Sequence, residues 1–363
     1  MAHLGSGRQC CCSIASPDLL SHLAEKGETD EQRRAAIKAL AASASMRTQR
    51  AIAGQLEGQL LGEVASVAGP APAGEARQTV YDLQGGGRSA LPGEQRRTTG
   101  EGATGDEAVD EVFDATEATY RLYRDEFGRD SVDGKGLELV SSIHYSSKFD
   151  NAFWNGAQMV YGDGSGHLFQ VGALTKAVDV IGHELTHGVT QFTAALEYSS
   201  QPGALNESFS DVFGSLVKQH KLGQSADQAD WLIGEGTLVP TIGKALRSMK
   251  EPGTAWSGDR QPGDMAHYVD LPDDGDPAND NGGVHINSGI PNHAFYLAAT
   301  KIGGNAWEKA GKVWFETLTG GHLKPDADFA AAAAATQSVA ASLFGAEGAE
   351  HTAVAEAWRE VGL

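Results

Sequence analysis

The segment HELTH at positions 183–187 contains two histidines four residues apart with a glutamate between them. On a helix this spacing places both imidazoles on one face, one turn apart, where two ring nitrogens can bind a single zinc ion. Glu184 would then lie beside the metal, placed to take a proton from a water that the metal activates. The same short pattern also occurs by chance on helices, so the zinc hypothesis depends on the residues that follow.

A catalytic zinc needs a third protein ligand and one position open to water. A second helix is expected to begin near Ala204, and it carries Glu207 as the candidate third ligand. Asn206 and Asp211 lie on either side and are expected to hold the free imidazole N–H groups of the two histidines. The helix dipole favours acids at a helix start, which could explain Glu207 alone but not the whole set.

Periodicity and turn residues divide the chain into a helical front, a β-rich part and a helical rest. Residues 1–50 are typical of a small helical unit, and 51–77 of a linker or processing region. One helix near 106–127 interrupts short strands in the β-rich part, and a loop rich in Asp, Gly, Pro and Asn covers 251–283. We therefore expect an α+β fold with a β-rich lobe over 78–190, an α-helical lobe over 191–363 and a cleft between them. The expected helices of the second half are 174–194, 204–220, 287–302, 305–319 and 326–343.

Composition excludes some functions. The chain has 363 residues and a formal net charge of −20, from 28 Lys and Arg against 48 Asp and Glu, so a nucleic-acid partner is not expected. No segment approaches the ~20 apolar residues of a membrane span, and no apolar stretch typical of a signal peptide follows the N-terminus. The chain has three consecutive cysteines, Cys10, Cys11 and Cys12, which are too close together to form disulfides that cross-link the fold. They could be uncommitted thiols, a lipid-modified tail or a thiolate that touches a metal.

Four blocks of sequence resemble the thermolysin family of neutral metallopeptidases, over roughly residues 78–363. In chain order they are DNAFWNG with MVYGDG (150–164), HELTHGVTQ (183–191), GALNESFSD (203–211) and DNGGVHINSGI (280–290). Two neighbouring classes do not fit. Metzincins need a third histidine where this chain has Thr193, and the exopeptidase motif of zinc aminopeptidases is missing.

The resemblance implies a role for each matched residue of the reaction centre. His183, His187 and Glu207 would bind one zinc ion, and Glu184 would be the general base. His285 and Tyr198 would donate hydrogen bonds to the developing oxyanion, with Asp280 orienting the His285 ring. The alternatives are a capping or core histidine at 285 and a merely packed tyrosine at 198.

The resemblance also implies how a peptide would bind. Asn151, Ala152 and Trp154 would pair with the substrate backbone as an added strand, and Arg247 would bind a substrate carbonyl unless it serves only in a surface salt bridge. A preference for Leu, Phe or similar residues after the scissile bond is expected from the residues that would line that pocket, namely Phe169, Leu174, Val180 and Leu246.

Many family members bind a pair of calcium ions behind the active helix. Asp179, Asp230 and Glu235 fit such a site, but Lys218 stands where those members have a glutamate. An ammonium among carboxylates can replace one cation, so we expect one calcium ion or none here.

The front of the chain is similar to the short propeptide of the protealysin-like subgroup. The match lies in Cys12-Ser13-Ile14 and in Pro17-Asp18-Leu19-Leu20, with a single proline where the subgroup has a pair. It implies an autoinhibitory segment removed by self-cleavage between about 45 and 77, unless this is a dispensable tail. The family implies a secreted, monomeric enzyme acting on peptides or proteins. Without a visible signal peptide, a cytoplasmic location or non-standard export stays open. Two other functions also stay open. One is a catalytically silent scaffold that binds peptides, and the other is an intracellular zinc protein that acts mainly through a protein partner or inhibitor.

Overall fold

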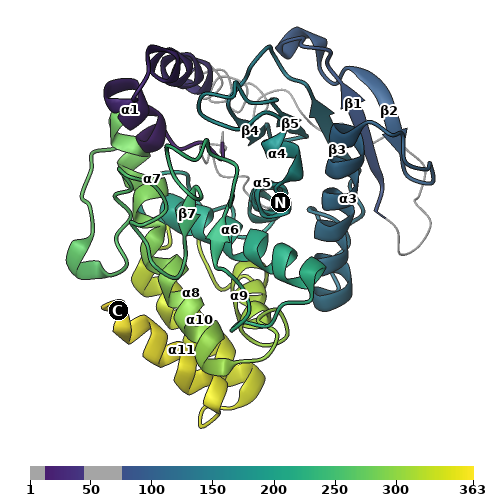
Figure 1. The fold of residues 1–363 in the computed structure, drawn as a ribbon. Helices are drawn as coiled ribbons and strands as arrows, with labels where there is room; N and C mark the ends of the chain where they lie inside the picture. The colour runs from purple at the N-terminus through teal and green to yellow at the C-terminus, as the bar shows by residue number, and fades with distance from the viewer. Residues whose placement is uncertain (1–12, 45–75) are drawn as a thin grey trace, which may run out of the picture.

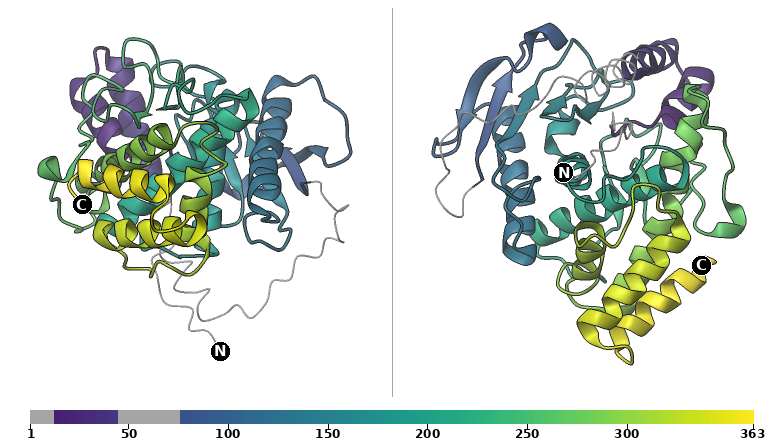
Figure 2. Two further views of the ribbon diagram at one scale, coloured as in Figure 1. Left: turned by 90° about the horizontal axis from the view of Figure 1, so that it is seen from below. Right: turned by 180° about the vertical axis from the view of Figure 1, so that it is seen from behind.

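The computed structural model describes residues 13–44 and 76–363 (Figure 1). The three cysteines, and the expected processing region apart from its last two residues, lie outside the described residues. The expected α+β architecture is confirmed. Strands gather in the N-terminal half of the catalytic part, and helices make up its C-terminal half (Figure 2).

The strands form a five-stranded sheet in the order β2-β1-β3-β5-β4. β1 pairs antiparallel with β2 and parallel with β3, β3 pairs parallel with β5, and β5 pairs antiparallel with β4. The short strand β4 therefore forms one edge of the sheet, and its three residues are buried. The strands are β1 (Gln78–Asp82), β2 (Glu94–Thr98), β3 (Leu139–Ile143), β4 (Ala152–Trp154) and β5 (Met159–Tyr161).

Helix α3 (Glu107–Arg121) covers this lobe as its apolar spacing predicts. Asp106 caps its first turn by accepting from the backbone N–H groups of Ala108 and Val109. The helix continues into a π-helical turn, Leu122–Glu126. The inner face of α3 is buried, with Val109, Val112, Phe113, Thr116 and Tyr120 among the buried residues.

Two helices cross at the centre of the molecule, α5 (Val178–Gln191) and α6 (Ser200–Leu222). Glycines permit their close approach, since a Cβ on Gly214 would lie only 2.4 Å from the carbonyl oxygen of Asp179. α6 begins at Ser200 and not near Ala204, so Glu207 lies beyond the first turn. The helix dipole acts mainly within the first turn and therefore does not explain this glutamate.

The remaining helices form the second lobe. The expected loop at 251–283 is largely irregular, but its end already belongs to α7, where Asn281, Gly282 and Gly283 adopt positive φ angles. A short ribbon pairs β6 (Leu232–Ile233) with β7 (Arg247–Ser248). Within the described part of the chain, no helix has the length and apolar character that crossing a membrane requires. Besides the four-residue α4 (Ala173–Lys176), the helices are α7 (Asp280–Asn287), α8 (Gly289–Ile302), α9 (Ala310–Thr319), α10 (Phe329–Phe344) and α11 (Ala349–Glu360).

The front segment, residues 13–44, lies against both lobes. Its helix α1 (Pro17–Lys26) begins with Ser16 as N-cap and packs beside α7 (Figure 1), and a second helix covers 30–44. Lys38 Nζ donates to the carbonyl of Ser147 in the sheet lobe. The ring of His22 meets Trp256 of the helical lobe at 5.3 Å.

Candidate active site

The expected zinc ligands converge on one point at the crossing of α5 and α6. One ligand atom from each of His183, His187 and Glu207 lies within 4.8 Å of the others, and all three residues are buried. The two imidazole Nε2 atoms are 3.0 Å apart. Each also lies 3.5 Å from an oxygen of Glu207.

Groups behind the histidines fix their orientation. His183 Nδ1 lies 2.8 Å from Asp211 Oδ1, and His187 Nδ1 lies 2.9 Å from Asn206 Oδ1. Ser210 Oγ is a further partner of His187 Nδ1 at 3.0 Å. With both Nδ1 atoms engaged in this way, the Nε2 lone pairs point towards the shared site.

The protonation states suit a metal cation. Burial lowers the pKa of His187 to about 3, so its imidazole is neutral near pH 7. Burial would raise the pKa of Glu207, but the charges of His285, His187 and His183 lower it to about 2. Glu207 Oε2 is buried and accepts no hydrogen bond from the described residues. The neutral imidazole of His187, the carboxylate of Glu207 and its unpaired buried oxygen suit a zinc site.

Arg247 and Asn292 hold Asp211 from the side away from His183. Arg247 Nε and Nη2 donate to the two oxygens of Asp211 at 2.7 and 2.8 Å, and Asn292 Nδ2 donates to Oδ2 at 2.8 Å. Burial works against ionisation of Asp211, but Arg247 and His183 hold the pKa of this carboxyl well below its usual range. The interaction of Arg247 is therefore a buried ion pair and not the surface salt bridge weighed as an alternative.

Glu184 is fully buried on α5, and its Oε2 accepts a hydrogen bond from the backbone N–H of Trp154 at 3.0 Å. This bond ties the expected general base to the edge strand β4. The N–H of Trp154, expected to pair with substrate, is therefore directed to Glu184.

Tyr198 and His285 face the metal ligands from the other side. The Tyr198 hydroxyl donates to Glu207 Oε1 and lies 3.2 Å from His285 Nε2. Asp280 Oδ1 is 2.6 Å from His285 Nδ1, and Asp280 Oδ2 accepts from the His285 backbone N–H at 2.7 Å. Burial opposes protonation of His285, but the carboxylates of Asp280 and Glu207 raise its pKa. Burial and the charge of Glu207 raise the pKa of Tyr198 well above its ordinary value.

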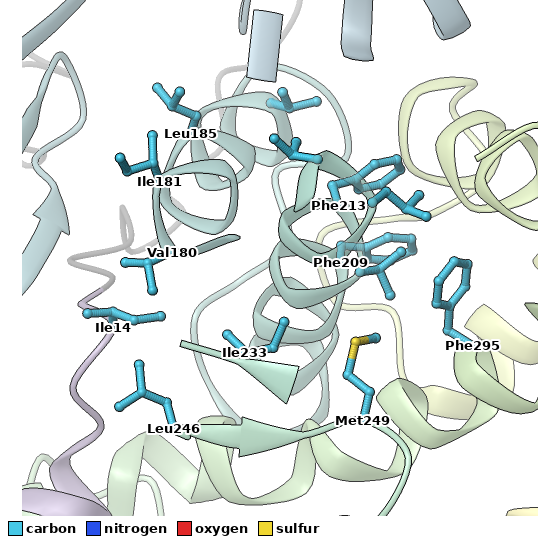
Figure 3. Packing of buried hydrophobic residues seen from close by; sticks show 14 of the residues in the cluster. Ile14, Val180, Ile181, Leu185, Phe209, Phe213, Ile233, Leu246, Met249 and Phe295 are labelled. Carbon is cyan, nitrogen blue, oxygen red and sulfur yellow. The ribbon is translucent and has the colours of Figure 1, made fainter. Parts of the chain in front are cut away.

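The front segment occupies the edge of β4. The backbone N–H of Ile14 donates to the carbonyl of Ala152 at 3.1 Å, and that of Ala15 donates to Asn151 Oδ1 at 3.0 Å. Ile14 is fully buried, and Figure 3 shows it beside Val180 and Leu246. Of the other expected pocket residues, Leu174 is also buried, and Phe169 is buried and bridges to Leu238.

A second anchor of the front segment is the ion pair of Asp18 and Arg260. Asp18 Oδ1 accepts from Arg260 Nε at 2.9 Å and also from Nη2. Burial raises the pKa of Asp18, although the guanidinium opposes the rise.

Lys218 lies among the three carboxylates expected to bind calcium. Its Nζ is 2.6 Å from Asp230, 3.6 Å from Asp179 and 3.8 Å from Glu235. Burial opposes its charge, but Asp179 and Asp230 raise the pKa of this ammonium.

Sequence reasoning missed four residues that hold the site or the front segment: Ser210, Arg260, Asn292, and Gln261, which donates to the backbone carbonyl of His285. Ser210 had a usable signal, because it lies one helical turn beyond Asn206 and so faces the same way. The other three come from distant segments and carry no local signal.

Comparison with known proteins gives the class and then the family. The thermolysin metallopeptidase catalytic domain matches residues 74–191, and the thermolysin metallopeptidase alpha-helical domain matches 194–363. The extracellular metalloprotease of Pectobacterium carotovorum subsp. carotovorum is 43% identical, over 97% of this chain and 96% of the relative. Bacillolysin of Bacillus amyloliquefaciens is 46% identical, over 67% of this chain and 42% of its own length.

A solved structure, the precursor of protealysin, a metalloproteinase from Serratia proteamaculans, is also similar. It has 44% sequence identity and a TM-score of 0.82, with 97% of this chain and 99% of that chain covered. The chain therefore belongs to the thermolysin family of metallopeptidases, and it resembles protealysin within that family. It is a metalloendopeptidase, and the cluster of His183, His187 and Glu207 fits the zinc ion that the family uses.

Proposed function

We propose that this endopeptidase is made as a self-processing precursor, is secreted, and cuts on the N-terminal side of bulky apolar residues. The position of Ile14 carries the proposed precursor form and cleavage preference, and the similarity to an extracellular metalloprotease supports secretion. The main chain of Ile14 pairs with Ala152 while its side chain is buried beside Val180 and Leu246. An extended substrate would use the same sheet edge once the front segment has left.

His183, His187 and Glu207 would hold the zinc ion. When bound, zinc supplies Lewis acidity, which lowers the pKa of water and polarises the scissile carbonyl. Glu184 takes the proton of the attacking water and passes it to the leaving amine. The hydrogen bond from Trp154 orients this carboxylate before a substrate arrives.

Tyr198 and His285 donate hydrogen bonds to the oxyanion. The raised pKa of Tyr198 keeps its hydroxyl protonated, and Asp280 turns the His285 ring so that Nε2 faces the site. Donors fixed in place before the reaction stabilise developing charge without reorganisation.

Substrate binding uses the groups that now hold the front segment. Ala152 and Asn151 accept backbone N–H groups of the peptide, as they do from Ile14 and Ala15. Arg247 commits Nε and Nη2 to Asp211, which leaves Nη1 as the group for a substrate carbonyl.

The test compares peptides that differ only in the residue after the scissile bond. We expect Leu and Phe to be cut and Asp to be resisted. Both Glu184→Ala and a zinc chelator should abolish cleavage. Equal cleavage of Leu and Asp peptides would refute the specificity. Zinc-loaded protein that binds peptides but never cuts them would instead indicate a binding role.

A further inference from the structure

Gln261 reaches the backbone of His285 from a distant segment. Its Nε2 donates to the carbonyl of His285 at 2.7 Å and to Ser288 Oγ at 3.1 Å. Ser288 Oγ donates to the same carbonyl at 2.9 Å. Carbonyls in the last turn of a helix lack intrahelical partners, and His285 lies in the last turn of α7. Gln261 and Ser288 supply the partners that this carbonyl needs.

The segment that carries Gln261 is itself tightly held. Asp259 accepts from the backbone N–H groups of Ala255 and Gln261, both at 3.1 Å. The following turn packs against the start of α8. A Cβ on Gly289 would lie 2.6 Å from the carbonyl oxygen of Pro262 and 3.0 Å from Gln261 Cβ. Gln261 therefore has little freedom to follow a displaced His285.

His285 is thus fixed at two ends. Asp280 holds its ring and its backbone N–H, and Gln261 holds its carbonyl. Without Gln261, Ser288, which lies between α7 and α8, would be the remaining side-chain partner of that carbonyl among the described residues. The last turn of α7 could then shift and carry Nε2 away from its place 3.2 Å from the Tyr198 hydroxyl.

We propose that Gln261 is a positioning residue for His285, acting through the backbone of that histidine on stabilisation of the oxyanion. The proposal rests on the proposed role of His285 in the reaction.

The test uses the full zinc-loaded chain, processed by a trace of tagged wild-type enzyme that is then removed. Gln261→Met keeps the length of the side chain but removes its donor. We expect kcat to fall about tenfold and KM to change by less than about twofold. Ser257 is exposed in the same loop, so Ser257→Ala is the matched control and should leave both constants unchanged. A rise in KM with unchanged kcat would overturn the proposal.

Two further measurements separate positioning from a general structural defect. In a His285→Phe background, Gln261→Met should lower kcat by less than about a further twofold, because the residue that Gln261 positions is gone. An undiminished tenfold loss there would refute the proposal. If Gln261→Met proves unstable, Gln261→Asn, whose amide is one methylene shorter, replaces it in the same cycle.

Binding of a phosphonamidate peptide, a tetrahedral anion, gives an answer without turnover. Its affinity should fall by the same factor as kcat, while affinity for the product peptide stays unchanged. A wild-type protein that binds the phosphonamidate but cuts nothing would refute the proposed function and still decide the role of Gln261.

Discussion

The backbone N–H of Ile14 donates to the carbonyl of Ala152 at 3.1 Å. This bond joins the front of the chain to the edge of the sheet at β4, the strand that contacts the helix that carries Glu184. The front segment therefore occupies the edge that an extended peptide would use.

Replacing Ile14 by Asp should loosen the front segment. Burying an isoleucine side chain contributes about 1.5–3 kcal/mol, so docking should weaken about 10–100-fold. The measurement is the rate of tryptic cleavage at Arg33 and Arg34 in a Glu184→Ala background, which prevents self-processing. Ile37 is 56% exposed in the same segment, so Ile37→Asp should leave the rate unchanged. Equal rates for both variants would contradict the anchoring role of Ile14.

The Asp18–Arg260 pair should respond unequally to loss of its two members. Arg260→Ala leaves the buried carboxylate of Asp18 without its cation and should loosen the front segment at pH 7. Asp18→Asn leaves no buried charge and should weaken docking of the front segment only slightly. Hydrogen–deuterium exchange of the amides of α1 measures both effects. Faster exchange in Asp18→Asn than in Arg260→Ala would show that the pair itself drives docking.

The pH dependence of docking follows from the raised pKa of Asp18. The docked form binds a proton more readily than the released form, so this residue favours docking at low pH. That contribution is lost as the pH rises through the docked pKa. We expect the protection factors of the α1 amides, which correct for the intrinsic exchange rate, to fall as the pH rises through this window, and we expect Asp18→Asn to remove this fall. Protection factors that fall on acidification in the wild type and not in Asp18→Asn would contradict the assignment.

Asp211→Ala should weaken zinc binding, since Asp211 holds His183 Nδ1 at 2.8 Å. Losing such a partner typically costs 10–100-fold in metal affinity. Competition with a chelator measures the change. Asp227 is exposed, so Asp227→Ala serves as the control. Unaltered zinc affinity in Asp211→Ala would show that His183 is oriented by other means.

Lys218 should make the carboxylates around it independent of calcium. Lys218→Ala leaves Asp179 buried without a cation, and we expect a loss of about 3 kcal/mol in the free energy of unfolding. Calcium should restore part of that loss, whereas the wild type should not respond to calcium at this site. Lys221→Ala, on the exposed face of the same helix, is the control. Calorimetric titration that finds a tight calcium site among these carboxylates in the wild type would refute the idea that Lys218 replaces calcium here.

Helical spacing and the family resemblance predicted the convergence of the metal ligands, whereas several contacts that depend only on topology were missed. His183, His187 and Glu207 could be paired because each lies on a helix whose face is set by a fixed period. The structure begins α6 at Ser200, before the expected start near Ala204, because Pro202 is tolerated in the first turn of a helix.

Long-range contacts had no such signal. Asp18 and Arg260 are 242 residues apart, and Asp211 and Asn292 are 81 residues apart. The packing of α1 against the helical lobe and of α8 against α6 brings these pairs together. Likewise, the bond from Trp154 to Glu184 exists because β4 passes beside α5, which no periodicity in either segment reveals.

Self-cleavage of the intact chain tests the central claim most directly. Wild type and Glu184→Ala are purified with one zinc ion each, and their N-termini are sequenced after incubation. We expect the wild type to lose its front segment by a cut between about 45 and 77, and Glu184→Ala to stay intact with its zinc bound. Processing of purified Glu184→Ala at the wild-type rate would contradict the account.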